Sequence, residues 1–299
     1  MEITNIGGTL VVEPDASGNG GTLTLDTNTT SLSGTYQAEE LVIANATTVD
    51  GGNVTTDTLS GSGAVTVNSG SLTVTGTNAS TGAITNAGGT VSLPTAGALT
   101  LSGGTTTVTG ATTGAVTMTN GAVATLDDVT GNVSVANTGN LTAGAITGTL
   151  TLTNTAVAEV ESVSSTITDA AGTTLTVTGT QSLGATTIAG TATFEGAVTL
   201  TGTLTVNGTA TVDDITATGQ TITVAAAGTL VVNGTLDDLS TISGSATSTV
   251  TFGPEAVVTT GALTNWMQSD GSTPIAALTD LAGKTFEHGG TNWVEQVAP

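Results

Sequence analysis

Three pairs of adjacent aspartates form the densest grouping of chemically active side chains in the sequence. Asp127-Asp128, Asp213-Asp214 and Asp237-Asp238 each follow a threonine and an aliphatic residue, and another aliphatic residue comes next. Successive side chains of a strand point in opposite directions, so two acids in a row indicate a turn where both carboxylates are solvated. Carboxylate oxygens on a loop are also ligands for Ca²⁺. The sequence leaves two interpretations open, solvated corners or a calcium site with the ligands Asp127, Asp128, Asp213, Asp214, Asp237 and Asp238.

Other catalytic chemistry has little support. The single histidine, His288, stands in Glu287-His288-Gly289-Gly290, a segment typical of a loop. Nucleophilic catalysis needs a base that a partner side chain orients, and the sequence has no cysteine and no zinc-helix, phosphate-loop or dinucleotide motif. Paired carboxylates can cleave glycosidic bonds, usually beside basic residues, but Lys284 is the only lysine or arginine. We therefore expect no enzymatic activity and no required cofactor, with calcium as the one candidate ligand.

The charge of the chain limits its partners. Of 299 residues 23 are acidic, and the formal net charge is −22. Nucleic-acid binding requires cations that displace phosphate counterions, and anionic membrane surfaces also attract cations. No stretch is long and apolar enough to predict a membrane-spanning helix. The composition excludes nucleic acid and membrane insertion, and it leaves copies of the same chain, divalent cations and neutral glycans as partners.

An internal repeat predicts the fold. Units that begin at Gly97, Gly114, Gly131 and Gly148 follow one another at a constant interval. The third and fifth positions of each unit are apolar, and the fourth is Thr or Ser, which is the period-2 alternation of a strand with one buried face. The inward positions are Leu99, Leu101, Val116, Met118, Val133, Val135, Leu150 and Leu152, and the outward ones are Thr100, Thr117, Ser134 and Thr151.

Two further apolar points recur in each unit. One lies near position 10 or 11, at Val123, Leu141 and Val157. The other lies near position 16, at Val129, Ile146 and Val163. Stacked turns of this kind bury a shared core that no single turn can bury alone. We predict an all-β protein, a β-solenoid (β-helix) of roughly 17-residue coils, with tandem β-sandwich domains as the alternative.

Outside the regular stretch the period drifts. The octapeptide that begins at Gly202 returns at Gly228 with small changes, after an interval longer than one regular unit, which suggests longer coils or a change of fold. The outward threonines resemble the flat hydroxyl arrays of solenoid ice-binding proteins, but Ser134 and the drifting period interrupt the expected column. Threonine is also simply a good strand former.

The last fifty residues have a different composition. Phe252, Trp266, Phe286 and Trp293 all lie there, although aromatic residues make up only 2% of the chain. We predict a solenoid domain over residues 1–250 and a distinct C-terminal cap or docking element over residues 251–299, because an open solenoid end must be covered. The two tryptophans would fill the core of this cap or form an interface or glycan-stacking platform.

The near-absence of Lys and Arg, the acidic balance and the lack of cysteine together resemble bacterial surface-layer proteins and other substrates of one-step export. With the repeat, the chain resembles bacterial β-solenoid surface proteins of the surface-layer, adhesin or extracellular filament type. The resemblance implies a non-enzymatic structural protein that self-assembles outside the cell or on its surface.

Two other functions remain open. The segment Met1–Asn5 lacks the basic region of a secretory signal, which would suit a virion fibre or capsid decoration protein assembled inside a cell. A polysaccharide-binding or polysaccharide-cleaving β-helix protein is the other alternative. For assembly, we expect cation-dependent pairing of chain ends, with the stretch Ile3–Val12 added as a strand to the aromatic C-terminal segment.

Overall fold

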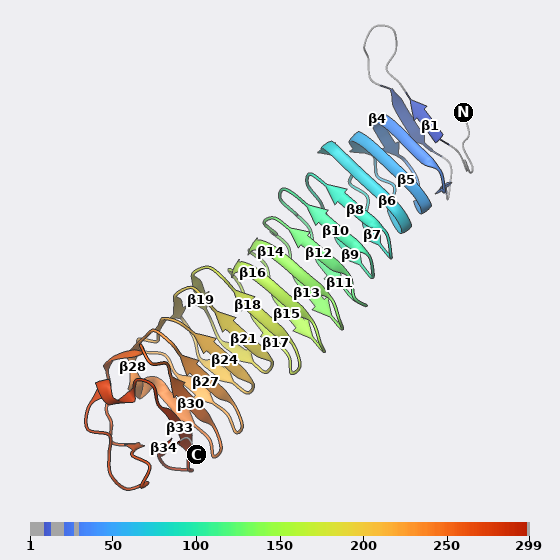
Figure 1. Ribbon diagram of the computed structural model, residues 1–299. Helices are drawn as coiled ribbons and strands as arrows, with labels where there is room; N and C mark the ends of the chain where they lie inside the picture. Colours follow the sequence, from blue (N-terminus) through green and yellow to red (C-terminus); the bar gives the residue numbers. More distant parts are fainter. Residues whose placement is uncertain (1–8, 13–20, 27–29, 298–299) are drawn as a thin grey trace. The chain divides into compact units, whose positions relative to one another are not determined.

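The computed structural model describes residues 9–12, 21–26 and 30–297 (Figure 1). Strands account for 55% of the chain and helix for 3%, and the strands form a β-solenoid with turns spaced about 18 residues apart, which confirms the predicted fold class. In the described residues, strands pair in parallel everywhere except in the C-terminal segment. The β-sandwich alternative is therefore wrong, because sandwich sheets are antiparallel.

The chain divides into two compact units, residues 1–147 and 148–299, each of which stacks its turns in three faces. In the first unit the first face consists of β3 (Thr30–Leu32), the starts of β5 (Thr47–Ser60) and β6 (Val65–Asn78), β7 (Ile84–Asn86), β9 (Leu99–Leu101), β11 (Val116–Met118) and β13 (Val133–Ala136). The second face contains β1 (Thr9–Val12), the start of β4 (Thr35–Ile43), later parts of β5 and β6, β8 (Thr90–Leu93), β10 (Thr105–Val108), β12 (Val123–Leu126) and β14 (Asn140–Ile146). The third face has β2 (Thr22–Leu25) and the ends of β4, β5 and β6, then single bridges at Ala96, Thr112, Val129 and Ile146.

The second unit repeats this plan. Its first face holds β15 (Leu150–Thr153), β17 (Ile167–Asp169), β20 (Thr186–Ile188), β23 (Leu204–Val206), β26 (Ile222–Val224) and β29 (Ile242–Gly244). The second face holds β16 (Val157–Val163), β18 (Thr174–Val177), β21 (Thr191–Phe194), β24 (Thr209–Val212), β27 (Thr229–Val232) and β30 (Thr249–Phe252). The third face holds β19 (Gln181–Leu183), β22 (Val198–Leu200), β25 (Ile215–Thr216), β28 (Thr235–Asp238) and β31 (Val257–Thr260).

The first-face register agrees with the sequence pattern. Val116 pairs with Leu99 on one side and Val133 on the other, and all three are buried. Thr117 pairs with Thr100 and Ser134, whose side chains face solvent. The inward and outward positions of these strands are therefore confirmed, as are the buried third-face residues Val129, Ile146 and Val163.

The second-face register differs by one residue from the prediction. Val123 and Val157 point outward, with exposed fractions of 42% and 41%, and the residues that follow them, Ala124 and Ala158, are buried instead. Ala124 pairs with Leu141, the one residue of the predicted set that does face inward. A shift of one residue turns every side chain of a strand to the other face. The prediction therefore exchanged the inward and outward side chains of these two strands.

The repetition of the octapeptide at Gly202 and Gly228 does not correspond to a turn. Leu204 in the first copy belongs to β23 on the first face and pairs with Ile222, whereas Leu230 in the second copy belongs to β27 on the second face and pairs with Ala210. The same strand sequence therefore serves two different faces, since both require the same alternation of apolar and hydroxyl side chains.

The C-terminal segment folds back on the last turns. β33 (Thr285–His288) pairs antiparallel with the outer edge of β30, and β34 (Trp293–Gln296) pairs with β33 and with β32 (Trp266–Met267). Trp266 stacks on Trp293 with centroids 5.2 Å apart and meets Phe286 edge-on at 5.0 Å. Both tryptophans are 3% exposed. They fill the core of this segment, as one of the two interpretations predicted, and they offer little open ring surface for a glycan.

The same segment bears on the predicted pairing of chain ends. In the expected donor stretch, residues 3–8 lie outside the described residues, and Thr9–Val12 pairs with β4 of the same chain. At the expected acceptor end, β33 already occupies the outer edge of β30.

Candidate functional site

Two of the three aspartate pairs lie at corners between the second and third faces. Asp128 follows β12, and its Oδ1 accepts a hydrogen bond from the Ala145 amide of the next turn at 2.9 Å. Asp214 follows β24, and its Oδ1 accepts from the Thr235 amide of the next turn at 2.6 Å. Each carboxylate thus provides the hydrogen-bond partner of a backbone N–H in the next turn. This is a structural role for an exposed acid.

A glycine stands directly before each of these amides. A Cβ built on Gly144 would lie 2.6 Å from Asp128 Oδ1, and one built on Gly234 would lie 2.5 Å from Asp214 Oδ1. A side chain at either position would displace the carboxylate. An acid at one corner followed by a glycine one turn later is a pattern in the sequence that could predict these capping contacts.

The third pair is arranged differently. Asp237 accepts from the Ala217 amide of the preceding turn at 2.8 Å and from Thr218 Oγ1 at 2.6 Å. Asp238 precedes the short 3₁₀ helix η1 (Leu239–Thr241) and accepts from the Ser240 amide at 2.9 Å. This pair holds one corner and caps one helix, the usual role of an acid at a helix N-terminus.

Calcium binding at the aspartate pairs stays a prediction. The pair at residues 127–128 belongs to the first compact unit and the other two belong to the second. Among the residues that the structure describes, no group of three or more His, Cys, Asp or Glu side chains could hold a metal ion. The contacts that are observed are hydrogen bonds to the corners of the coil.

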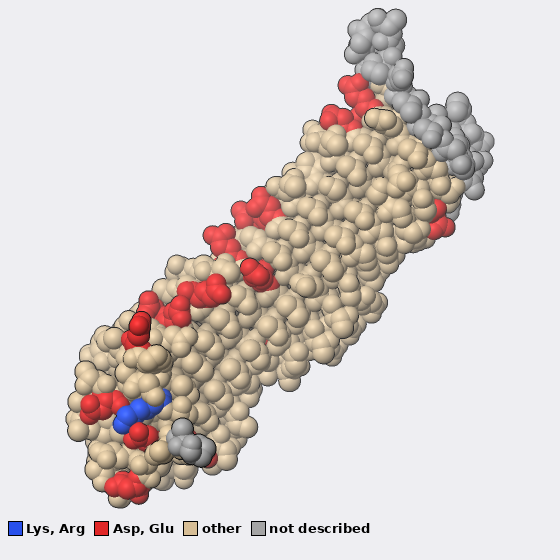
Figure 2. Space-filling view, in the orientation of Figure 1, with Lys and Arg blue, Asp and Glu red and all other residues tan. Residues whose placement is uncertain are grey.

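Many of the exposed and half-exposed acids of the coil lie along one corner of each unit, between the second and third faces. Those at this corner are Glu39, Glu40, Asp57, Asp127 and Asp128 in the first unit and Glu161, Glu195, Asp213 and Asp214 in the second, whereas Asp50 and Glu159 are exposed elsewhere on the coil. Figure 2 shows carboxylates in red along one edge of each unit beside a broad surface that is almost free of them. The net charge is therefore unevenly distributed around the solenoid.

A buried carboxyl interrupts the aliphatic core of the second unit. Asp169 is 2% exposed and pairs with Leu152 and Ile188 on the first face. It accepts hydrogen bonds from the Thr173 hydroxyl and from the Gly190 amide, the latter at 3.0 Å. Burial raises the pKa of this carboxyl, and the hydrogen bonds from Thr173 and Gly190 oppose the rise.

A buried amide lies two faces further along the same turn, on the third face. Gln181 is 2% exposed, its Oε1 accepts from the Val163 amide at 2.8 Å, and its Nε2 donates to the Val163 carbonyl at 2.5 Å. The side chain therefore makes both bonds that a neighbouring strand would make. Asp169 and Gln181 were not among the residues predicted from the sequence, although Asp169 stands one repeat unit after the inward Leu152.

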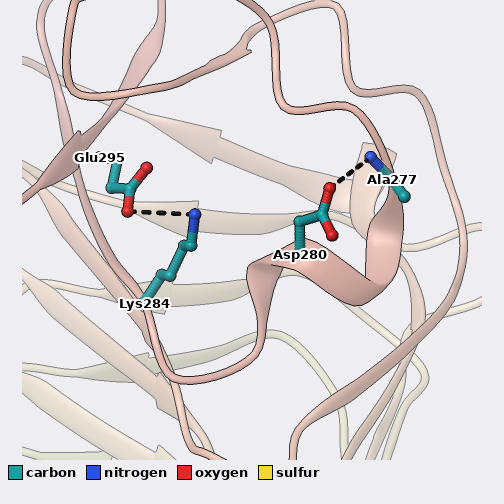
Figure 3. A network of polar contacts seen from close by, with 4 residues as sticks. All are labelled: Ala277, Asp280, Lys284 and Glu295. Atoms are coloured by element: carbon teal, nitrogen blue, oxygen red, sulfur yellow. Dashed lines mark hydrogen bonds and ion pairs between the residues drawn. The ribbon is translucent and has the colours of Figure 1, made fainter.

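The C-terminal segment holds the histidine and the lysine. His288 Nδ1 accepts from the Gly290 amide at 3.2 Å, its ring meets Trp293 edge-on at 4.9 Å, and partial burial lowers its pKa. Lys284 pairs with Glu295 at 3.1 Å, and Asp280 Oδ2 accepts from the Ala277 amide at 3.0 Å beside η2 (Leu278–Leu281) (Figure 3). These contacts tie the segment together.

A shallow hollow on the third face of the first unit is lined by Asn78, Ser80, Thr95, Thr113 and small apolar residues. Its lining carries no aromatic or charged side chain on which a sugar could stack or be clamped.

No helix of the described chain is long and apolar enough to cross a membrane. No protein-family model, curated protein or solved structure matches the chain.

Proposed function

We propose that the chain is a non-enzymatic structural protein that assembles with copies of itself outside the cell or on its surface. The observation that carries the proposal is the use of carboxylates as corner caps. Asp128, Asp214 and Asp237 each accept a hydrogen bond from a backbone amide of an adjacent turn. A side chain that holds the coil in this way supports a scaffold, because catalysis would need it free to exchange protons or bind a sugar.

Repetition supports self-assembly. In each unit, one turn after another exposes similar hydroxyl side chains at the same register positions. Any contact made by one turn can therefore be repeated by the next, so weak contacts add along the solenoid.

The test is the assembly state of the purified chain. Sedimentation velocity and negative-stain microscopy would be run at low and physiological ionic strength, with added Ca²⁺ and with a chelator. We expect species larger than a monomer, with ordered filaments or sheets that grow as salt screens the net charge. A monomer under all of these conditions would contradict the proposal, and release of reducing sugar from neutral or acidic glycans would favour the polysaccharide-cleaving alternative.

The acidic composition described above supports the proposed location outside the cell. A virion fibre or decoration protein would also need a rigid repeat. The genes beside the coding sequence separate the two. An export system would support the surface component, and capsid or tail genes would support the virion part.

A further inference from the structure

The first face of the first unit carries a continuous column of outward hydroxyl side chains. Register pairs connect them from turn to turn without a break. In chain order the column is Ser31, Thr48, Thr66, Thr85, Thr100, Thr117 and Ser134. All seven side chains are exposed or half-exposed. The changing turn length therefore leaves the column intact, because the length changes fall in the corners.

The second unit has the same column on its own first face. It comprises Thr151, Thr168, Thr187, Thr205, Thr223 and Ser243. Ser243 Oγ donates to Thr223 Oγ1 at 3.3 Å, so neighbouring hydroxyls lie within reach of one another. The column of each unit, taken by itself, is called the hydroxyl face of that unit below.

The outward positions of both columns bear no charge, in a chain with a net charge of −22. The acidic corner described above lies between the second and third faces of each unit, so the first face is the one that it does not border. In the second unit, Glu159 also lies at an outward position of the second face, and β28 on the third face ends in Asp237 and Asp238. In the first unit, one exposed acid, Asp50, stands at the end of the first-face part of β5. The hydroxyl face is therefore the side of each unit away from the acidic corner, where like charge opposes the approach of an identical chain least.

The backbone stacks closely at the corner that precedes this face. Gly114 and Gly131 lie two residues before β11 and β13, and a Cβ on either would collide with the backbone of the preceding turn. These two positions therefore carry no side chain that could hold a flat partner away from the column.

We propose that the hydroxyl face of the first unit docks against the hydroxyl face of the first unit in a second copy of this chain. The same patch then serves both partners, which is the isologous contact of a two-fold dimer. Threonine methyl groups pack and hydroxyls exchange hydrogen bonds across the contact, while the acidic corners stay in solvent. This inference rests on the proposed function and assigns it a surface.

The test compares two double variants that carry the same added charge on the same two turns. Thr100→Asp with Thr117→Asp places two acids on the hydroxyl face, and Thr105→Asp with Thr125→Asp places two on exposed second-face positions. Circular dichroism and thermal melting establish that both remain folded. By sedimentation, we expect the first pair to weaken association at least tenfold and the second pair to leave it within about twofold of the wild type.

Single cysteines provide a second measurement, because the chain contains no cysteine. Thr117→Cys should form disulfide-linked dimers with itself on oxidation if the two-fold axis passes near it, and Thr125→Cys should not. A scan of Thr85, Thr100 and Thr117 locates the axis.

The outcomes separate the inference from the proposed function. Equal weakening by both double variants, or assembly of the hydroxyl-face variant as strong as the wild type, overturns the inference and leaves self-assembly standing. A monomeric wild-type chain overturns both. If that monomer inhibits ice recrystallisation and the hydroxyl-face variant does not, the hydroxyl face binds ordered water and not a second copy of the chain.

Discussion

The turns at residues 99–146 and the turn at residues 167–183 have the same fold but different interiors. In the first stretch, the inward side chains of the first face are Leu, Val and Met, and corresponding strands begin at Leu99, Val116 and Val133. In the second, Asp169 and Gln181 occupy inward positions and are fully hydrogen-bonded. The difference shows how a solenoid accommodates a change in its corners.

The corner after β17 contains four residues, 170–173, and the corner after β20 above it contains only two, 189–190. Corners of different length cannot pair their backbones residue by residue. Asp169 connects them, since it accepts from Thr173 in the long corner and from Gly190 in the short one. A polar side chain in the core is stable where it supplies the partner that the backbone lacks.

The largest effect is expected in the regular stretch. Val133→Asp places an unpaired carboxylate beside Val116 in an aliphatic core, and we expect a loss of at least about 3 kcal/mol in the free energy of unfolding. Ser134→Asp, its outward neighbour, should change stability by less than about 0.5 kcal/mol. Thermal and denaturant unfolding measure both, and equal losses would mean that the assigned register is wrong.

The next largest effect concerns the irregular turn. Gln181→Leu keeps the volume but leaves the buried amide and carbonyl of Val163 without a partner, which should cost about 2–4 kcal/mol. Gln181→Ala adds a cavity and should cost somewhat more. If the Leu variant unfolds at the wild-type denaturant concentration, Gln181 acts by filling space and not by pairing with Val163.

Thr112 tests, within the regular stretch, whether a buried polar group needs a hydrogen-bond partner. It lies between Ala96 and Val129 on the third face, is fully buried, and its hydroxyl has no hydrogen-bond partner among the described residues. Thr112→Val removes the unsatisfied group at almost constant volume and should raise the free energy of unfolding by about 1 kcal/mol. A destabilised variant would indicate that an ordered water satisfies the hydroxyl in solution.

The regular turns could be predicted because their signal is redundant. Leu99 and Val116 repeat the same alternation one unit apart, and the strands pair in that register. The second-face error arose because Val123 and Ala124 are both apolar, and hydrophobicity favoured the larger residue even though it faces outward. Asp169 breaks the inward pattern visibly, but its partner Gly190 is found only when the corner lengths are known, and those depend on how the turns stack.

Asp169 also makes stability depend on pH. Its pKa is raised in the folded chain, so between its ordinary value of 3.8 and the raised value the folded state binds more protons than the unfolded state. The free energy of unfolding should therefore fall as the pH rises through this window. Asp169→Asn keeps an acceptor for Gly190, abolishes this contribution and should stabilise the chain at neutral pH.

The pKa of Asp270 is shifted in the opposite direction, so its effect on stability has the opposite dependence on pH. Hydrogen bonds from Thr273 and Ser272 lower its pKa to about 2, so its stabilising effect is present above pH 4 and is lost as the pH falls toward 2. Melting curves of the wild type and of Asp169→Asn across this range distinguish the two acids. An unchanged pH profile in the Asn variant would contradict a raised pKa of Asp169 in the folded chain.

The smallest effect is expected at the acidic corner, where it separates capping from calcium binding. Asp128→Asn retains an oxygen that can accept from Ala145, so as a cap it should lose less than about 0.5 kcal/mol, whereas Asp128→Ala should lose about 1 kcal/mol. A calcium site responds differently, because the amide removes the negative charge that binds the ion. Melting curves with millimolar Ca²⁺ and with chelator decide between them. A calcium-dependent rise in melting temperature that Asp128→Asn abolishes would assign this corner to the ion, and equal curves for the wild type in both buffers would leave Asp128 as a cap on the next turn of the coil.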